Sequence, residues 1–150
     1  MLINYGWRTA RLAALLAALL TPPLTAGAAR GAIFLAGLLL MISGALLRQH
    51  CIRTLGNHFS YEVKVSERSP IVTRGLYKWV RHPSYTGGML FNLGIGLALT
   101  NWSSIAFIVV GMFVIYLYRV HVEEQALIQI HRADYLNYMR YTKRFVPYLF

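Results

Sequence analysis

Acidic side chains are scarce in this sequence. Of its 150 residues, five are Asp or Glu, against 15 Lys or Arg, so the formal net charge is +10. The one cysteine, Cys51, excludes an internal disulfide, because a disulfide needs two thiols. The five histidines show neither HExxH nor CxxC-type spacing. The sequence therefore predicts no metal site.

Several common enzyme loops are also missing. Ser84 lacks a GxSxG elbow, which argues against serine hydrolysis. No glycine-rich phosphate loop is present, so an NTP site or a Rossmann-type dinucleotide site has no support. The excess of basic residues is not accompanied by a soluble module with base-contacting or stacking elements. Nucleic-acid binding is therefore not predicted.

Charge is absent from three long stretches of a chain that is 57% hydrophobic, with a mean hydropathy of +0.47. A hydrocarbon core of about 30 Å needs about 20 helical residues, so the first two stretches each fit one span and the third fits two. The third is interrupted by LTNWSS, which supplies turn-forming and interfacial residues. We predict an all-α integral membrane protein with about four transmembrane helices in two hairpins, at residues 9–29, 31–47, 84–100 and 103–118.

Basic residues gather in the segments that these spans would place on one face. Because Lys and Arg stay on the cytoplasmic side of short loops, both termini, residues 48–82 and residues 119–150 are expected to be cytoplasmic. Arg8 and Arg11 followed by LAALLAALL could instead form a cleavable signal peptide. The next residues lead straight into another apolar stretch, which favours a retained helix.

The polar segments have regular patterns of their own. Residues 48–82 are predicted to lie along the membrane interface, with YEVKV at 61–65 alternating like a short strand. The C-terminal segment is predicted to be an amphipathic helix from about residue 118 to 138, because Val122, Ala126 and Ile130 share one face. Glycines in the second helical pair are expected to allow close helix packing.

Ionisable residues flank the second helical pair. Arg81 and His82 precede the third span, whereas Arg119, Glu123 and Glu124 follow the fourth. An antiparallel hairpin would bring the two groups together at one mouth of a helical cleft. The plainest alternative is simple structural pairing of opposite charges, yet two consecutive acidic residues beside a membrane favour a functional site.

The run GLYKWVRHPSYTGG, an apolar hairpin and then VEEQALIQIHRADYLNYMRYTKRFVP occur in this order. With the upstream TLGNHFSYEVKV, they cover residues 52–147 and resemble the isoprenylcysteine carboxyl methyltransferase family of integral-membrane enzymes. The resemblance implies transfer of a methyl group from S-adenosylmethionine, bound on the cytoplasmic side and partly enclosed by the C-terminal helix, to a lipophilic acceptor from the bilayer.

The resemblance also implies site residues. The expected cofactor-binding residues are Ile71, Val72, Tyr77, His82, Pro83, Ser84, Tyr85 and Glu123. The expected catalytic residues are Arg81, Arg119 and Glu124, with Arg119 facing the acceptor carboxylate.

The natural acceptor stays open at this stage. The resemblance favours carboxyl O-methylation of an isoprenylcysteine-like small molecule or peptide, in contact with membrane lipid. Related membrane methyltransferases act on phospholipid amines or small thiols, so N- or S-methylation is the alternative. A noncatalytic membrane scaffold is a second alternative. The short chain suggests a small bacterial member in the inner membrane, and the oligomeric state is not predicted.

Overall fold

The computed structural model describes residues 2–56 and 70–145 of the chain. Helices form almost all of its regular structure: α1 (Leu2–Leu20), α2 (Gly27–Leu55), the short 3-10 helix η2 (Gly75–Lys78), α3 (Pro83–Ala98) and α4 (Trp102–Tyr141). Over these residues the prediction of an all-α protein is confirmed. The predicted strand YEVKV lies outside the described residues.

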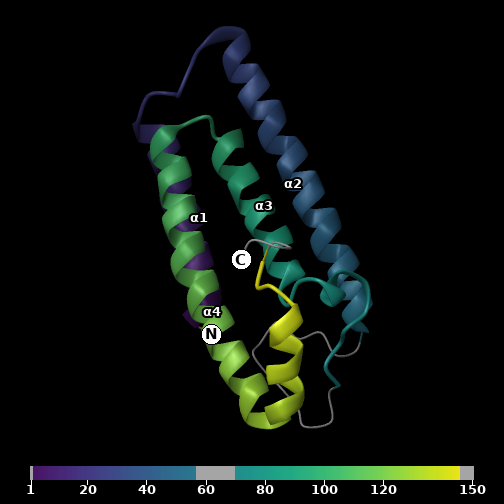
Figure 1. Ribbon diagram of the computed structural model, residues 1–150. Coiled ribbons are helices and arrows are strands. Elements are labelled where there is room, and N and C mark those ends of the chain that lie inside the picture. Colours follow the sequence, from purple (N-terminus) through teal and green to yellow (C-terminus); the bar gives the residue numbers. More distant parts are fainter. Residues whose placement is uncertain (1, 57–69, 146–150) are drawn as a thin grey trace.

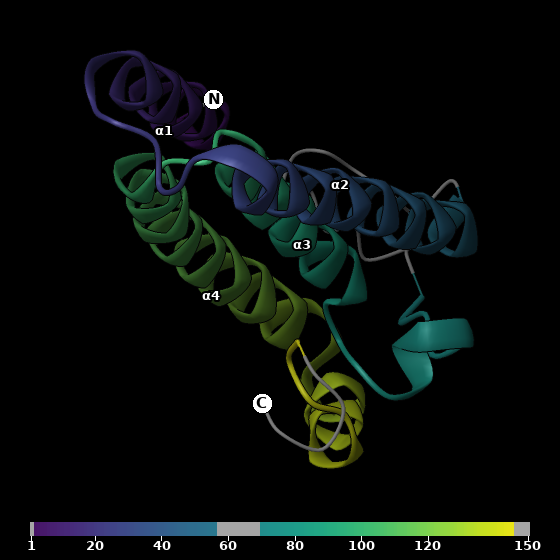
Figure 2. The ribbon, with the colours of Figure 1, turned by 90° about the horizontal axis from the view of Figure 1, so that it is seen from above.

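The pairs of helices that pack together differ from the predicted pairs. The main contacts join α2 to α3, α3 to α4, and α4 to α1, as Figures 1 and 2 show from two directions. The second pair, α3 and α4, forms the expected hairpin, but α1 and α2 pack chiefly on different partners. The prediction that α1 and α2 pack together as a first hairpin is therefore wrong.

Glycines on facing surfaces explain why α2 prefers α3. A Cβ added at Gly44 would lie 2.5 Å from the Phe91 backbone nitrogen and 2.6 Å from the Gly87 carbonyl oxygen. A Cβ added at Gly37 would lie 2.8 Å from the Gly94 carbonyl oxygen. The two backbones approach so closely that only hydrogen fits at these positions, as in other small-residue helix contacts.

The helix ends differ from those predicted. The first helix was expected at residues 9–29, but α1 ends at Leu20, before Pro22 and Pro23, because the residue before a proline disfavours helical geometry. The second, expected at 31–47, extends to Leu55. The fourth continues into the predicted C-terminal helix, with a non-helical φ of 41° at Arg132 marking a kink.

The turn between α3 and α4 is tied to the connection between α1 and α2. Asn101 caps α4, since its Oδ1 accepts a hydrogen bond from the Ser104 backbone nitrogen at 3.1 Å. Its Nδ2 donates to Thr21 Oγ1 at 2.7 Å and to the Pro22 carbonyl at 2.8 Å. These hydrogen bonds join the two connections at the end of the molecule opposite the candidate site.

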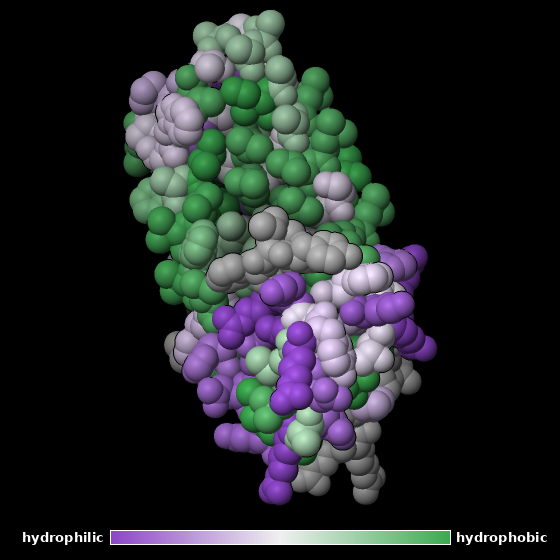
Figure 3. Space-filling view, in the orientation of Figure 1, coloured by the Kyte–Doolittle hydropathy of each residue, from purple (hydrophilic) through white to green (hydrophobic). Residues whose placement is uncertain are grey.

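Among the described residues, two helices are long and apolar enough to cross a membrane, α2 and α4. Figure 3 shows an apolar body over most of the molecule's length and a polar part at the end where α4 turns back. The apolar surface includes exposed Leu39, Leu46, Phe113 and Val114. Surfaces of this kind mark contact with lipid or another protein.

Candidate active site

Glu124 is the centre of the first cluster at the polar end. Its Oε1 accepts a hydrogen bond from Arg81 Nε at 2.9 Å, and His82 Nε2 lies 3.4 Å from the same oxygen. Arg144 Nη2 lies 2.9 Å from Oε2. The Glu124 side chain is only 5% exposed, so it carries its charge in a nearly dry environment.

The cluster exists because the end of α4 turns back and pairs with the segment before α3. Val80 and Lys143 form a parallel bridge, in which the Arg81 nitrogen donates to the Lys143 carbonyl at 2.7 Å. The His82 nitrogen donates to the Arg144 carbonyl at 2.9 Å. Arg81 Nη1 also donates to the Thr142 carbonyl oxygen. These bonds hold Arg81 and His82 beside Glu124.

The charge of Glu124 is strongly stabilised. Burial by itself would raise the pKa of this carboxyl group, but the hydrogen bonds and charges of His82 and Arg81 outweigh burial. The pKa of Glu124 is lowered to about 2 as a result. The carboxylate is thus ionised at neutral pH and acts as an acceptor for its three basic neighbours.

Glu123 belongs to a second cluster. The Tyr85 hydroxyl, on the first turn of α3, donates a hydrogen bond to Glu123 Oε2. Arg119 Nε in turn donates to the Tyr85 hydroxyl at 2.7 Å. Glu123 and Glu124 are consecutive residues and point about 100° apart on a helix, so each serves a different cluster.

An aromatic layer joins the two clusters. The rings of His82 and Tyr85 are stacked, with centroids 5.4 Å apart, and the Tyr85 ring also contacts Tyr116 at 5.4 Å. Tyr85, Tyr116 and Phe145 belong to one buried apolar cluster. The charged groups are therefore backed by a layer that excludes water.

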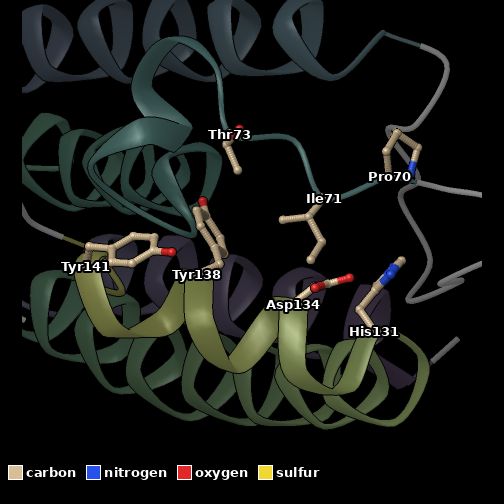
Figure 4. Close-up of a pocket in the computed structure, with 7 residues that line it drawn as sticks. All are labelled: Pro70, Ile71, Thr73, His131, Asp134, Tyr138 and Tyr141. Carbon is tan, nitrogen blue, oxygen red and sulfur yellow. The ribbon is translucent and has the colours of Figure 1, made fainter.

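A cavity of about 400 Å³ lies between the last turns of α4 and residues 70–73, and Figure 4 shows side chains of the two segments facing each other across it. Its size is that of pockets that bind small molecules. The residues that line it are Pro70, Ile71, Thr73, His131, Asp134, Tyr138 and Tyr141. The Tyr138 hydroxyl donates to the Tyr77 carbonyl oxygen at 2.6 Å, which connects the cavity wall to η2.

The structure gathers most of the predicted site residues in this region. His82, Tyr85, Arg119, Glu123 and Glu124 meet in the two clusters together with Arg81. The other predicted residues lie along the segment leading into α3.

Ile71 lines the cavity, and Val72 follows it, half-buried. Tyr77 is buried on η2, and Pro83 is the first residue of α3. The Ser84 carbonyl oxygen accepts a hydrogen bond from Arg48 Nη1 at 3.1 Å.

Three residues of this region were not predicted: Arg144, Arg48 and Tyr138. Arg144 stands in a basic run, RYTKR, whose charge was attributed to membrane topology. Arg48 was attributed to a cytoplasmic segment for the same reason. Tyr138 lies at the end of the predicted C-terminal helix, where it was given no role in the site. No local signal separates these residues from neighbours of the same type.

A family model described as the isoprenylcysteine carboxyl methyltransferase (ICMT) family matches residues 36–129, which are more than half of the chain. The chain belongs to this family. The match includes the RHPSY run at the start of α3 and both glutamates of the clusters. Family membership, with the apolar helices α2 and α4, indicates an integral membrane protein.

Individual relatives agree with the family assignment. The chain is 33% identical to the protein-S-isoprenylcysteine O-methyltransferase of Saccharomyces cerevisiae, over 75% of this chain and 48% of the relative. It is 34% identical to the Arabidopsis thaliana protein-S-isoprenylcysteine O-methyltransferase A, over 75% of this chain and 58% of the relative. The chain thus spans about half the length of the curated relatives it matches.

A solved structure shares the fold. The eukaryotic intramembrane Ras methyltransferase ICMT, without a monobody, superposes with a TM-score of 0.75 at 25% identity. The similarity covers 97% of this chain and 52% of that one. The arrangement of four helices and a returning C-terminal segment therefore corresponds to part of a larger ICMT-family fold.

Proposed function

We propose that the chain transfers a methyl group from S-adenosylmethionine to the carboxylate of an isoprenylcysteine-like acceptor. The observation that carries this proposal is the pairing of the residues around Pro83 with Glu123 and Glu124 in a member of this family. The names of the curated relatives, which are protein-S-isoprenylcysteine O-methyltransferases, support the same chemistry.

The described residues fit a polar, nucleoside-containing donor. Ser84 Oγ, His131 Nε2 and the Tyr135 hydroxyl are buried and have no hydrogen-bond partner in the structure, so each can bind a polar group of a ligand. Burial, with the charge of Glu124, raises the pKa of Tyr135, so its hydroxyl stays protonated. The cavity beside Ile71 offers space of the size that such ligands occupy.

S-adenosylmethionine, when bound, supplies a methyl group that is already activated by a positively charged sulfur. A carboxylate acceptor is already a nucleophile, so the protein needs to align the partners and exclude water rather than remove a proton. The stacked rings of His82 and Tyr85 provide a dry wall, and the Arg119 guanidinium lies over the Tyr85 ring, 5.3 Å from its centroid. Glu123 would accept hydrogen bonds from donor hydroxyl groups.

Arg81 and Glu124 would support the reaction by holding parts of the site together. Arg81 is only 8% exposed and is held by Glu124 and two backbone carbonyl groups, Met139 and Thr142. We therefore assign this pair to holding the segment before α3 against the C-terminal segment. Arg119, on the Tyr85 side, would face the acceptor carboxylate, since a guanidinium fork matches two carboxylate oxygens.

The proposal includes the membrane arrangement predicted from the sequence: four spans, with both termini and the site on the cytoplasmic side of a bacterial inner membrane. It is supported by the separation of an apolar body from one polar end, which Figure 3 shows. It is also supported by the basic residues of that end, which the positive-inside rule assigns to the cytoplasm.

Calorimetric titration of purified, detergent-solubilised protein with S-adenosylhomocysteine tests the donor site, with adenosine for comparison. Transfer of radiolabelled methyl groups to N-acetyl-S-farnesylcysteine then tests the reaction. We expect saturable binding, tighter than that of adenosine, and label that mild base releases as methanol. Base-stable label on an amine or thiol acceptor would replace the carboxylate assignment. A folded sample that binds no S-adenosylhomocysteine would favour the noncatalytic scaffold.

A further inference from the structure

The short helix η2 has one buried side and one exposed side. Tyr77 is 6% exposed, whereas Leu76 and Trp79 are 36% and 49% exposed. The basic side chains of Arg74 and Lys78 are exposed as well. We call the exposed surface formed by Arg74, Leu76, Lys78 and Trp79 the η2 face. It combines apolar and positively charged side chains, as do protein surfaces that lie in a membrane interface.

Positive charge is concentrated at the η2 face. Lys78 Nζ lies 5.3 Å from the centroid of the Trp79 ring, so the ammonium group and the indole ring form one unit. Arg53, in the last turn of the neighbouring α2, adds a further exposed basic side chain. Among the described residues, acidic side chains occur only in α4, so neither η2 nor the end of α2 has a carboxylate of its own.

The position of η2 along α2 corresponds to the headgroup layer of a membrane. Arg74 Nη2 donates to the Thr54 carbonyl oxygen at 3.0 Å, and a Cβ added at Gly75 would lie 3.4 Å from Thr54 Cγ2. At the opposite end of α2, Arg30 Nε donates to Thr100 Oγ1 at 3.2 Å. The helix rises by about 36 Å from Arg30 to Thr54. A hydrocarbon core is about 30 Å thick and the bilayer with its headgroups about 40–45 Å, so η2 lies just beyond the core.

Backbone hydrogen bonds join η2 to the candidate site. The Tyr138 hydroxyl donates to the Tyr77 carbonyl oxygen at 2.6 Å, which connects η2 to the cavity wall. The Lys143 nitrogen donates to the Trp79 carbonyl oxygen at 3.1 Å, three residues before His82. A shift of η2 would therefore move both the cavity wall and the segment that carries His82.

We infer that the η2 face binds the headgroups of anionic lipids, and that this contact fixes the segment that binds the methyl donor. The inference rests on the membrane arrangement of the proposed function. Lys78 and Arg74 can donate to phosphate oxygens, while the Trp79 ring suits the depth of the headgroups. Each basic residue close to an anionic surface strengthens the attraction roughly fivefold. Phosphatidylcholine lacks this attraction, because its choline group cancels the phosphate charge.

Fluorescence quenching in lipid nanodiscs tests the lipid contact. Trp7→Phe and Trp102→Phe together leave Trp79 as the one tryptophan of the chain. The discs contain phosphatidylcholine with about one third phosphatidylglycerol. Bromine is placed on the acyl chains of the phosphatidylglycerol, or of an equal amount of phosphatidylcholine. We expect brominated phosphatidylglycerol to quench Trp79 at least about twofold more strongly, because the η2 face gathers this lipid around itself.

Variants separate the charges of η2 from the general charge of the same end of the molecule. Arg74→Gln combined with Lys78→Gln should make quenching by the two lipids equal, whereas Lys78→Arg keeps the charge and should keep the preference. Arg8→Gln is the matched control. It removes an exposed positive charge from α1, which lies across the molecule from η2 in Figures 1 and 2, and should leave the preference unchanged.

Calorimetric titration with S-adenosylhomocysteine, in discs without bromine, tests the effect on the site. This ligand has no net charge at neutral pH, so the surface potential of the membrane does not concentrate it. Binding is expected to be roughly fivefold tighter in discs with phosphatidylglycerol than in phosphatidylcholine alone. The double variant should lose this difference and bind as the wild type does in phosphatidylcholine, which shows that its fold is intact.

Equal quenching by the two lipids would overturn the inference, and so would a preference for phosphatidylglycerol that leaves the affinity for S-adenosylhomocysteine unchanged. Equal quenching in discs that hold two protein chains would assign the η2 face to a second copy instead. Lipid-independent binding of S-adenosylhomocysteine would retain the proposed function while removing the effect of lipid. Absence of binding in both kinds of disc would overturn the proposed function and the effect on the site, whereas the quenching still decides whether the η2 face binds anionic lipid.

Discussion

Arg81 Nε and Glu124 Oε1 lie 2.9 Å apart, although 43 positions separate these residues in the chain. The contact joins the segment before α3 to the middle of α4, and Arg144 of the returning C-terminal segment approaches the other carboxylate oxygen. One buried carboxylate thus links three parts of the polar end. The contact therefore fixes the position of the RHPSY run at the start of α3.

Replacing Glu124 should destabilise the protein strongly. In Glu124→Ala, Arg81 and His82 would stay buried without their carboxylate, a change that typically costs about 3–5 kcal/mol. The midpoint of thermal unfolding in detergent measures the effect. Gln125→Ala, at an exposed neighbouring position, is the control and should leave the midpoint close to that of the wild type. Similar midpoints for both variants would contradict the structural role of Glu124.

Acid should weaken the same cluster. The pKa of Glu124 lies at about 2 in the folded protein and has an ordinary value of 4.5, so the unfolded chain takes up the proton first. The stabilisation is complete above pH 4.5 and is lost as the pH falls toward 2. Unfolding midpoints measured between pH 7 and pH 2.5 should fall more steeply for the wild type than for Glu124→Gln. Parallel curves would show that Glu124 contributes nothing to the acid dependence.

Tyr85→Phe should weaken binding of the donor product. The substitution removes the hydroxyl that accepts from Arg119 and donates to Glu123, so Glu123 loses its fixed position. Affinity for S-adenosylhomocysteine is expected to fall roughly tenfold, as when a buried hydrogen bond is lost. Calorimetric titration provides the measurement, and Tyr118→Phe, at a side chain that is 60% exposed, is the control. Equal affinity in all three proteins would remove Tyr85 from the cofactor site.

Tyr138→Phe should loosen η2. The Tyr138 hydroxyl donates to the Tyr77 carbonyl oxygen, which is left without this donor in the variant, at a cost of about 1–3 kcal/mol. Hydrogen exchange at residues 75–80 should become faster than in the wild type. Tyr141→Phe removes a hydroxyl from the same cavity wall, at an exposed position, and should leave that exchange unchanged. Faster exchange in both variants would indicate a general effect of the cavity rather than this bond.

Gly44→Ala should separate α2 from α3. The new methyl group would meet backbone atoms of Phe91 and Gly87, which cannot rotate away, so we expect a loss of about 1–3 kcal/mol. Gly31→Ala is the matched control in the same helix, since nothing lies within 4 Å of its added Cβ. It should be neutral or slightly stabilising because alanine favours a helix over glycine. Both effects appear in thermal unfolding, and a harmless Gly44→Ala would contradict the close packing.

The sequence predicted the proximity of Arg81 and Glu124 better than the packing of α1 and α2. The hairpin that brings Arg81 close to Glu124 was expected, because an antiparallel pair of helices joins the ionisable residues that flank it. The contribution of Arg144 was not, because a basic residue near a membrane has a sufficient explanation in topology. Its role depends on the pairing of residues 143–144 with residues 81–82, which no local sequence pattern predicts.

The amino-acid sequence by itself determined the helical, apolar character of the chain, the start of α3 and the ionisable groups that directly precede this helix. These features depend on side-chain chemistry and on neighbours within a few residues. Tertiary structure alone decided that α2 packs on α3 through Gly44 and Gly87, and that Arg11 reaches Asn92. Such contacts require two surfaces, distant in the chain, to match in shape and hydrogen bonding, so neither surface reveals its partner on its own.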